Sequence, residues 1–262
     1  MILTEENYFS KEAETEYMSV SQFKLFSECQ AKAMATLNGE YVRPDTAALL
    51  VGSYVDAHFS GTLDLFLAKH PEIFKRDGTL KAEYINAWEI IERIERDELF
   101  MDYLLGEDQV IMTGEIEGIK VKIKIDSLHP DRIVDLKIMR DFEPIYKPGQ
   151  GKLPWFEAWG YDLQGAVYRE IVRQNTGEVL PFYLAAATKE KVTDIDIVKI
   201  GDDLLDYELD LFRKKAPFFD AIKKGVFLPE RCEKCDWCKE TKVLKRPRDS
   251  KEFIDEQSDN KG

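Results

Sequence analysis

The fold is decided by two adjoining stretches, Ile119-Lys120-Val121-Lys122-Ile123-Lys124-Ile125-Asp126 and Arg132-Ile133-Val134-Asp135-Leu136-Lys137-Ile138. Apolar and polar residues alternate strictly along the first stretch, which indicates a β-strand with one buried face. The apolar pair that precedes Asp135 favours a central strand for the second stretch. His129-Pro130-Asp131 supplies a turn between the two. We therefore expect neighbouring strands of one sheet.

Periodicity on either side of these strands extends the sheet and surrounds it with helices. Residues 110–116 are expected to form a preceding strand, joined by a tight turn at Glu117-Gly118. The remaining predicted elements are helices over about 19–38, 46–69 and 81–105, a loop over 146–154, a helix over about 155–174, strands over 180–187 and 193–200, and a helix over 202–224, after polar, irregular residues 1–18. This order predicts an α/β (α+β) domain with a mixed central sheet flanked by helices.

The composition bounds the class of protein. With 262 residues and 44% hydrophobic content, the chain can bury one sizeable core. It has no apolar run of transmembrane length, and its acidic N-terminus lacks the basic region of a secretory signal, so a soluble, cytoplasmic protein without a membrane partner is expected. The net charge of −13 disfavours a nucleic-acid binder, although binding depends on the local patch and bound cations reverse the sign of a carboxylate cluster.

Three polar residues on the two deciding strands form a candidate catalytic group. Asp126 ends the first strand, and Asp135 and Lys137 share one face of the second because they lie two residues apart. Nearby carboxylates repel each other, and Mg²⁺ or Mn²⁺, which prefer oxygen ligands, would relieve that repulsion. Such a metal activates water and polarises a phosphoryl oxygen, while the Lys137 ammonium can orient the water. The competing interpretation is an ordinary surface salt bridge between Asp135 and Lys137, which is common for an Asp-X-Lys pattern.

Ile125-Asp126 followed by Ile133-Val134-Asp135-Leu136-Lys137 resembles the core of the PD-(D/E)XK nucleases. The resemblance implies a restriction-endonuclease-like core in which Asp126 and Asp135 bind metal and Lys137 is the catalytic lysine. It also implies one nuclease-like domain over residues 1–244. Its expected parts are a helical region over about 19–105, a catalytic core over about 109–200, and a C-terminal helix with a cysteine cluster over about 201–240, followed by a disordered tail over 245–262.

Gln164 and Tyr168 share one face of the next predicted helix because they are four residues apart. They resemble the Gln-x-x-x-Tyr motif that follows the catalytic lysine in RecB-like nucleases, where the pair lines the active site. An ordinary helix surface with a half-buried tyrosine is the alternative, and the order along the chain favours the functional interpretation.

The Gly-x-x-x-His motif of RecB-like and RecE-like nucleases is altered here. Asp56, not a histidine, follows Gly52 by four residues, and His58 lies nearly on the opposite face of the predicted helix. An oxygen ligand suits Mg²⁺, so Asp56 is the stronger candidate for a further metal ligand and His58 the weaker one.

Lys120, Lys122 and Lys124 share a strand face with Asp126 and could form a basic stripe toward the metal. A solvated charge run is the favoured alternative, because Glu115 is expected to face Lys120 across the hairpin.

Cys232, Cys235 and Cys238 have a spacing typical of metal ligands. Cys29 resembles the early cysteine that joins three late ones in nucleases with an iron–sulfur cluster, although the last spacing here is shorter. Four thiolates could hold an iron–sulfur cluster or a structural zinc, and reduced cysteines without metal are the alternative.

The opening Leu3-Thr4-Glu5-Glu6-Asn7-Tyr8, with Met18-Ser19-Val20-Ser21, resembles the start of phage-type, RecE-like exonucleases. The resemblance implies a metal-dependent exonuclease that digests double-stranded DNA ends during recombination or DNA processing. It further implies a single-strand annealing protein as partner and a homo-oligomer. Two alternatives remain: a catalytically silent module of this fold that binds DNA ends or a protein, and a zinc-stapled adaptor.

Overall fold

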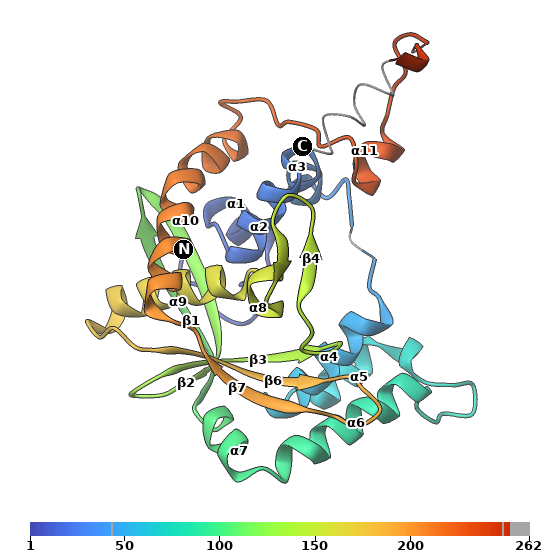
Figure 1. The fold of residues 1–262 in the computed structure, drawn as a ribbon, viewed down its shortest axis with the longest axis vertical. Coiled ribbons are helices and arrows are strands. Elements are labelled where there is room, and N and C mark those ends of the chain that lie inside the picture. The colour runs from blue at the N-terminus through green and yellow to red at the C-terminus, as the bar shows by residue number, and fades with distance from the viewer. Residues whose placement is uncertain (43, 248, 252–262) are drawn as a thin grey trace.

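A five-stranded mixed sheet runs through the centre of the computed structural model, which describes residues 1–42, 44–247 and 249–251 (Figure 1). In spatial order its strands are β1 (Glu107–Ile116), β2 (Ile119–Leu128), β3 (Ile133–Met139), β6 (Phe182–Thr188) and β7 (Ile195–Lys199). Neighbouring strands are antiparallel except β3 and β6, which are parallel. The predicted α/β class with a mixed central sheet is confirmed.

Helices cover both faces of this sheet (Figure 1). They are α1 (Lys11–Glu16), α2 (Val20–Glu28), α3 (Gln30–Asn38), α4 (Ala47–Phe59), α5 (Leu63–Lys69), the 3₁₀ turn η1 (Pro71–Ile73), α6 (Ala82–Glu95), α7 (Glu98–Leu104), α8 (Trp155–Ala158), α9 (Tyr161–Thr176), α10 (Asp202–Lys223) and α11 (Asp236–Glu240). One apolar core lies between the sheet and α2, α9 and α10, and a second lies between the sheet and α4, α6 and α7.

The β1–β2 hairpin follows the sequence prediction closely. Glu117 and Gly118 both have positive φ angles, 51° and 74°, as the two central residues of a tight type I′ turn require. Glu115 lies opposite Lys120 in the resulting register, as expected. Both strands are longer than predicted.

Three predicted helices are each divided in two. The helix expected over 46–69 is interrupted after α4, where Gly61 has a φ of 67°. The helix expected over 81–105 breaks before Asp97, whose side chain accepts a hydrogen bond from Phe100 N at 3.0 Å and starts α7. The helix expected over 19–38 breaks at Cys29, whose extended backbone ends α2 and starts α3. Apolar periodicity continues across each break, so it does not reveal them.

Two further regions differ from the prediction. Residues 1–18, expected to be irregular, contain the short α1, which Ser10 caps by accepting from Ala13 N. The loop expected over 146–154 is instead the hairpin of β4 (Ile145–Lys147) and β5 (Gly151–Leu153). Gly149 and Gly151 have φ angles of 78° and 82°, which glycine adopts readily in such a turn.

The helix expected over about 155–174 is also broken, and the break matters for the site. Trp159 and Gly160 separate α8 from α9, and Gly160 has a left-handed φ of 62°. A Cβ atom at Gly160 would lie 3.0 Å from Cε of Lys24, so glycine also leaves space for the end of the Lys24 side chain. The chain therefore turns sharply just before α9.

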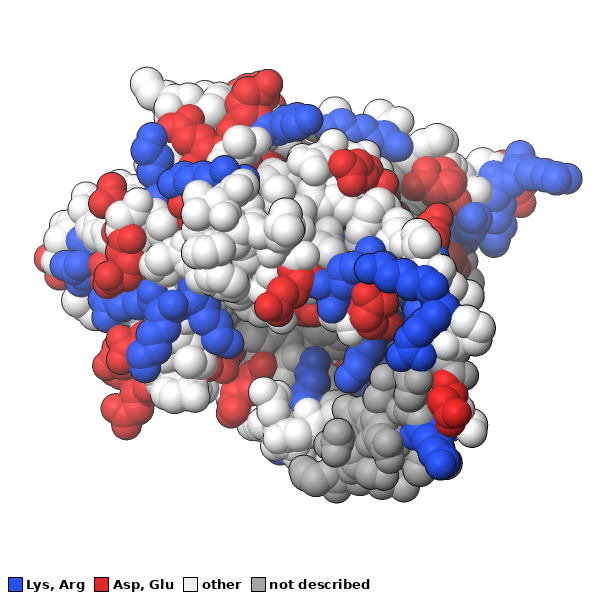
Figure 2. Space-filling model, turned by 90° about the horizontal axis from the view of Figure 1, so that it is seen from above, with Lys and Arg blue, Asp and Glu red and all other residues white. Residues whose placement is uncertain are grey.

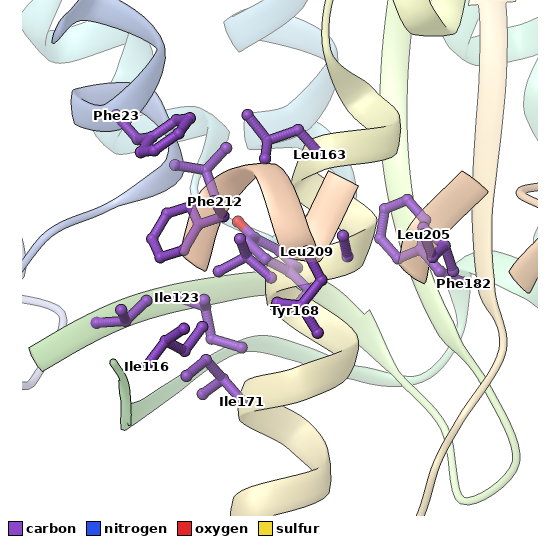
Figure 3. Packing of buried hydrophobic residues seen from close by; sticks show 14 of the residues in the cluster. Phe23, Ile116, Ile123, Leu163, Tyr168, Ile171, Phe182, Leu205, Leu209 and Phe212 are labelled. Carbon is purple, nitrogen blue, oxygen red and sulfur yellow. The ribbon is translucent and has the colours of Figure 1, made fainter. Parts of the chain in front are cut away.

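The core above the sheet fixes α9 and α10 against β2 and β6 (Figure 3). Phe23 of α2 stacks on Phe212 of α10 with ring centroids 4.6 Å apart. Ile171 of α9 is fully buried in the same cluster. Gly165 of α9 packs on Phe182 of β6 so closely that a Cβ atom would lie 2.4 Å from Cδ1 of the ring. Such contacts hold α9, which carries candidate site residues, at a set height above the strands.

Two sequence predictions concern membrane spans and the C-terminal tail. None of the helices in the described ranges is long and apolar enough to cross a membrane. Most of the predicted disordered tail over 245–262 falls on residues 248 and 252–262, which lie outside the described residues.

Gly165→Ala should lower the free energy of unfolding by about 1–3 kcal/mol, because the added methyl group must displace the buried Phe182 ring. Urea denaturation measures the change. Gly52→Ala is the matched control: it lies inside α4 with open space at the Cβ position, so alanine should be neutral or stabilising by up to about 1 kcal/mol. Equal losses in both variants would contradict the packing argument.

Candidate active site

The site lies where β2 and β3 separate. Their ladder pairs Ser127 with Val134 and Leu128 with Ile133, and the described pairing stops there. Extending this register by one residue would put Asp126 opposite Asp135. Instead, Asp126 Oδ2 accepts a hydrogen bond from Leu136 N at 3.0 Å. The aspartate side chain thus replaces a strand-to-strand backbone bond and brings its carboxylate to the adjoining strand.

Asp135 is the buried centre of this group, with 1% of its surface exposed. Gln164 Nε2 donates to its Oδ1 at 2.6 Å, and the Lys137 ammonium forms an ion pair at Oδ2. Oδ2 is buried, and its charged partner is this ammonium. A buried carboxylate normally needs a partner of this kind, and the Lys137 ammonium supplies it.

The charges in the site act strongly on one another. Burial raises the pKa of Asp126 well above its usual range, and the neighbouring charge of Asp135 raises it further. Burial opposes the charge of Lys137, but Asp135 and Asp126 prevail and raise the pKa of Lys137. Lys137 is therefore cationic at neutral pH and can donate hydrogen bonds, whereas it cannot act as a base. Asp126 and Asp135 both interact with the single positive charge of Lys137.

Gln164 and Tyr168 both contact the strands that carry the acids. Gln164 touches Asp135 directly, as described above. The Tyr168 hydroxyl donates to the backbone oxygen of Lys124 at 2.8 Å, two residues before Asp126. Their four-residue spacing on α9 therefore places one side chain on each of β3 and β2, and Tyr168 supports the acid through the backbone without touching it.

Asp56 and His58 have different surroundings in the structure, and only Asp56 is close to the site. Asp56 is partly buried on α4, and burial raises its pKa, with opposing effects from Lys137, which lowers it, and Asp135, which raises it. Asp56 therefore lies within electrostatic range of the site. His58 Nε2 lies 2.8 Å from Oε1 of Glu95 on α6, and its ring packs edge-on against Trp88.

Two of the three lysines of β2, Lys120 and Lys122, are paired with carboxylates and do not extend a basic stripe toward the site. Lys120 pairs with Glu16 at 2.7 Å, and the fully buried Lys122 pairs with Glu14 at 2.6 Å. Both carboxylates belong to α1, which sequence patterning did not reveal. The expected partner Glu115 lies opposite Lys120 in the register, but the ion pair of Lys120 is formed with α1 instead.

Two residues near Lys137 were missed by the sequence interpretation. The Tyr161 ring lies 4.8 Å from Lys137 Nζ, and Lys24 Nζ lies 5.2 Å from the same ring. Tyr161 could have been found, because it precedes Gln164 by three residues and shares its helix face. Nothing in the sequence connects Lys24 to the site, since it comes from α2 through tertiary packing.

The four cysteines come together where the start of α3 meets the segment around α11. Their sulfur atoms all lie within 4.8 Å of one another, and Cys29 and Cys238 are 3.6 Å apart. Within the described ranges this is the one group of three or more His, Cys, Asp or Glu ligand atoms gathered so closely. Asp56, Asp126 and Asp135 are more widely spaced. The predicted meeting of an early cysteine with three late ones is confirmed.

Comparison with known proteins identifies the family. Residues 19–241 match the profile of a family described as a PDDEXK-like domain of unknown function. The chain belongs to this PDDEXK-like family. Its fold is also similar to the crystal structure of a protein from Eubacterium rectale named "putative exonuclease", with 48% sequence identity and a TM-score of 0.94 over 97% of this chain and 98% of that one. No curated protein matches the sequence.

Membership of the PDDEXK-like family confirms the resemblance drawn from Asp126, Asp135 and Lys137, and the solved structure confirms the expected nuclease-like fold. The order of acid, acid and lysine along β2 and β3 follows the pattern for which the family is named. The roles of the individual residues remain predictions that rest on the geometry above.

Tyr168→Phe should reduce the free energy of unfolding by about 1 kcal/mol, because it removes the part-buried hydrogen bond to the Lys124 backbone oxygen. Urea unfolding followed by circular dichroism measures the loss. Tyr146→Phe is the matched control, since the Tyr146 side chain is 68% exposed and its hydroxyl can be replaced by water. An unchanged stability of Tyr168→Phe would show that this bond does not hold β2.

Proposed function

We propose that this PDDEXK-like protein is a metal-dependent nuclease that hydrolyses phosphodiester bonds of DNA and acts on double-stranded ends. The observation that carries the proposal is the arrangement of Asp126, Asp135 and Lys137 at the point where β2 and β3 separate. The exonuclease name of the similar protein from Eubacterium rectale supports an exonuclease over other members of the fold.

The residues present fit a divalent metal. Asp135 is almost fully buried, and Asp126 lies close enough for their charges to interact, with a pKa that burial raises first and Asp135 second. Asp126 and Asp135 would hold Mg²⁺ or Mn²⁺, with Asp56 as a further oxygen ligand. When bound, such a metal polarises a phosphoryl oxygen and lowers the pKa of a water molecule.

The protein's own residues would then position the reacting groups. Gln164 holds the Asp135 carboxylate in one orientation, and the Leu136 N–H does the same for Asp126. The Lys137 ammonium can donate to the attacking water or to the phosphate oxygens. As the new O–P bond forms and the bond to the leaving oxygen breaks, negative charge grows on those oxygens, and a cation fixed in a dry site stabilises it.

The surface charge is compatible with a nucleic-acid substrate despite the net charge of −13. Figure 2 shows Lys and Arg side chains interspersed with Asp and Glu around a hollow on the face that is uppermost in Figure 1. Clustered Lys and Arg side chains can attract phosphates locally even on an acidic protein, because the net charge acts mainly at long range.

Lys137→Ala and Asp135→Ala should each lower cleavage of linear duplex DNA by at least about a hundredfold, because each removes a group that stabilises or orients the reacting atoms. Gel assays with Mg²⁺ measure the loss. The native protein should digest linear duplex and leave closed circular duplex intact, and EDTA should stop digestion.

Lys214→Ala is the matched control, since Lys214 is an exposed lysine on α10 and its loss should leave cleavage unchanged. Full activity in folded Lys137→Ala would contradict the assignment of the site. Absence of cleavage by the folded native protein with Mg²⁺ and Mn²⁺ would favour the alternative of a catalytically silent module that binds DNA ends or a protein.

We also propose that the four cysteines bind a single zinc ion rather than a four-iron cluster. Four sulfur atoms around one zinc stand about 3.8 Å apart when each Zn–S bond is about 2.3 Å. Cys29 and Cys238 are 3.6 Å apart, and Cys232 and Cys238 are 4.0 Å apart. Thiolates of a four-iron cluster bind different iron atoms and stand further apart.

Elemental analysis of the purified protein should find one zinc per chain and no iron. Cys29→Ser should lose the zinc and lower the Tm by roughly 5 °C or more, because the ion joins the start of α3 to the C-terminal segment. Ser27→Ala, an exposed neighbour on α2, should change neither. Stoichiometric iron with visible absorption would refute zinc and favour the cluster.

The assignments beyond the reaction itself rest on the resemblance to phage-type enzymes. A role in recombination, a single-strand annealing protein as partner and a homo-oligomer all stay predictions. Sedimentation of the native protein would test the oligomer.

A further inference from the structure

An exposed tryptophan stands next to the active site. Trp159, between α8 and α9, is 52% exposed, and Lys147 of β4 lies over its ring with Nζ 5.6 Å from the centroid. Large aromatic rings are usually buried, so one held at the surface beneath a lysine is a feature to be explained.

A continuous series of contacts joins Trp159 to the catalytic lysine. Lys24 Nζ donates to the backbone oxygen of Trp159 at 2.9 Å and lies over the Tyr161 ring. Lys137 lies over the same ring. Trp159 and Tyr161 are two residues apart, so their Cα atoms lie within about 7 Å of each other. Aromatic and cationic groups therefore alternate from the active site to the surface.

Buried aromatic rings support the Tyr161 end of this surface. The buried Trp155 packs against Phe142, which precedes β4, and against Tyr161, with centroids 5.5 Å and 6.0 Å apart. Gly160, in its left-handed conformation, brings Lys24 close. A rigid aromatic surface loses little conformational entropy when a ligand stacks on it.

The two cations of this surface are not neutralised by a carboxylate in the described part of the chain. Lys24 and Lys147 form no ion pair with a carboxylate of the described residues, in contrast to Lys120 and Lys122. Burial first, and the nearby charge of Lys137 second, lower the pKa of Lys24 to about 8. A phosphate placed near Lys24 and Lys137 would relieve that repulsion.

We propose that Lys24, Lys147, Trp159 and Tyr161, the Trp159 platform, bind the unpaired bases and phosphates of the nucleic-acid strand that enters the active site. Stacked rings interleaved with cations suit a single strand, because every base has an aromatic face and every linkage a negative charge. The inference rests on the proposed nuclease function and refines it: the preferred substrate is an end with unpaired bases, either an overhang or a frayed duplex.

The same hairpin provides an internal control. Tyr146 pairs with Lys152 across β4 and β5, and successive strand residues point to opposite faces, so Tyr146 lies on the face away from Lys147. Tyr146 is at least as exposed as Trp159, and it is also near a lysine, but it does not belong to the series of contacts that leads to Lys137.

Fluorescence anisotropy with a fluorescein-labelled oligothymidylate, without added divalent metal, tests the platform. Trp159→Ala should raise the Kd about tenfold, Trp159→Phe should raise it about threefold at most, and Tyr146→Ala less than about twofold. Circular dichroism checks that each variant is folded.

The outcomes separate the two proposals. An unchanged Kd in Trp159→Ala, an equal loss in Tyr146→Ala, or no binding of the oligonucleotide by the native protein would overturn the platform, even if linear duplex is cleaved. Binding that depends on Trp159, in a protein that cleaves nothing, would leave the platform standing and refute the nuclease.

Discussion

The structure depends on how two carboxylates are held close together at the point where β2 and β3 part. Asp126 ends the ladder by taking the Leu136 N–H for itself, and Asp135 is buried against Lys137 and Gln164. Two acids in such surroundings repel each other, and burial adds to the cost of their charge. The core on both faces of the sheet must supply the stability that this local arrangement lacks.

That requirement explains the position of α9. Its apolar face packs on β2 and β6, with Gly165 against Phe182, so the helix lies close enough for Gln164 and Tyr168 to reach two different strands. The break at Gly160 then turns the chain and leaves Trp159 exposed above the same site. Packing, positioning of the acids and presentation of an aromatic ring thus follow from one helix and its first turn.

The ends of the chain are tied to this core by different chemistry. α1 supplies carboxylates to Lys120 and the buried Lys122 of β2. The N-terminal segment therefore neutralises two lysines that would otherwise have no ion-pair partner. The four cysteines join α3 to the C-terminal segment near α11. Both contacts link residues more than a hundred positions apart, and neither kind of link depends on extensive apolar burial.

The sequence by itself determined the sheet strands, the family resemblance and the grouping of Asp126, Asp135 and Lys137, because strand periodicity and short turns are local properties. It also placed Asp56 and His58 on different helix faces for the same reason. The helix breaks, the β4–β5 hairpin, the pairing of α1 with Lys122, and the positions of Lys24 and Trp159 were decided only by tertiary structure. These features depend on contacts between distant segments, and local patterning carries no information about which distant side chain will occupy a given place.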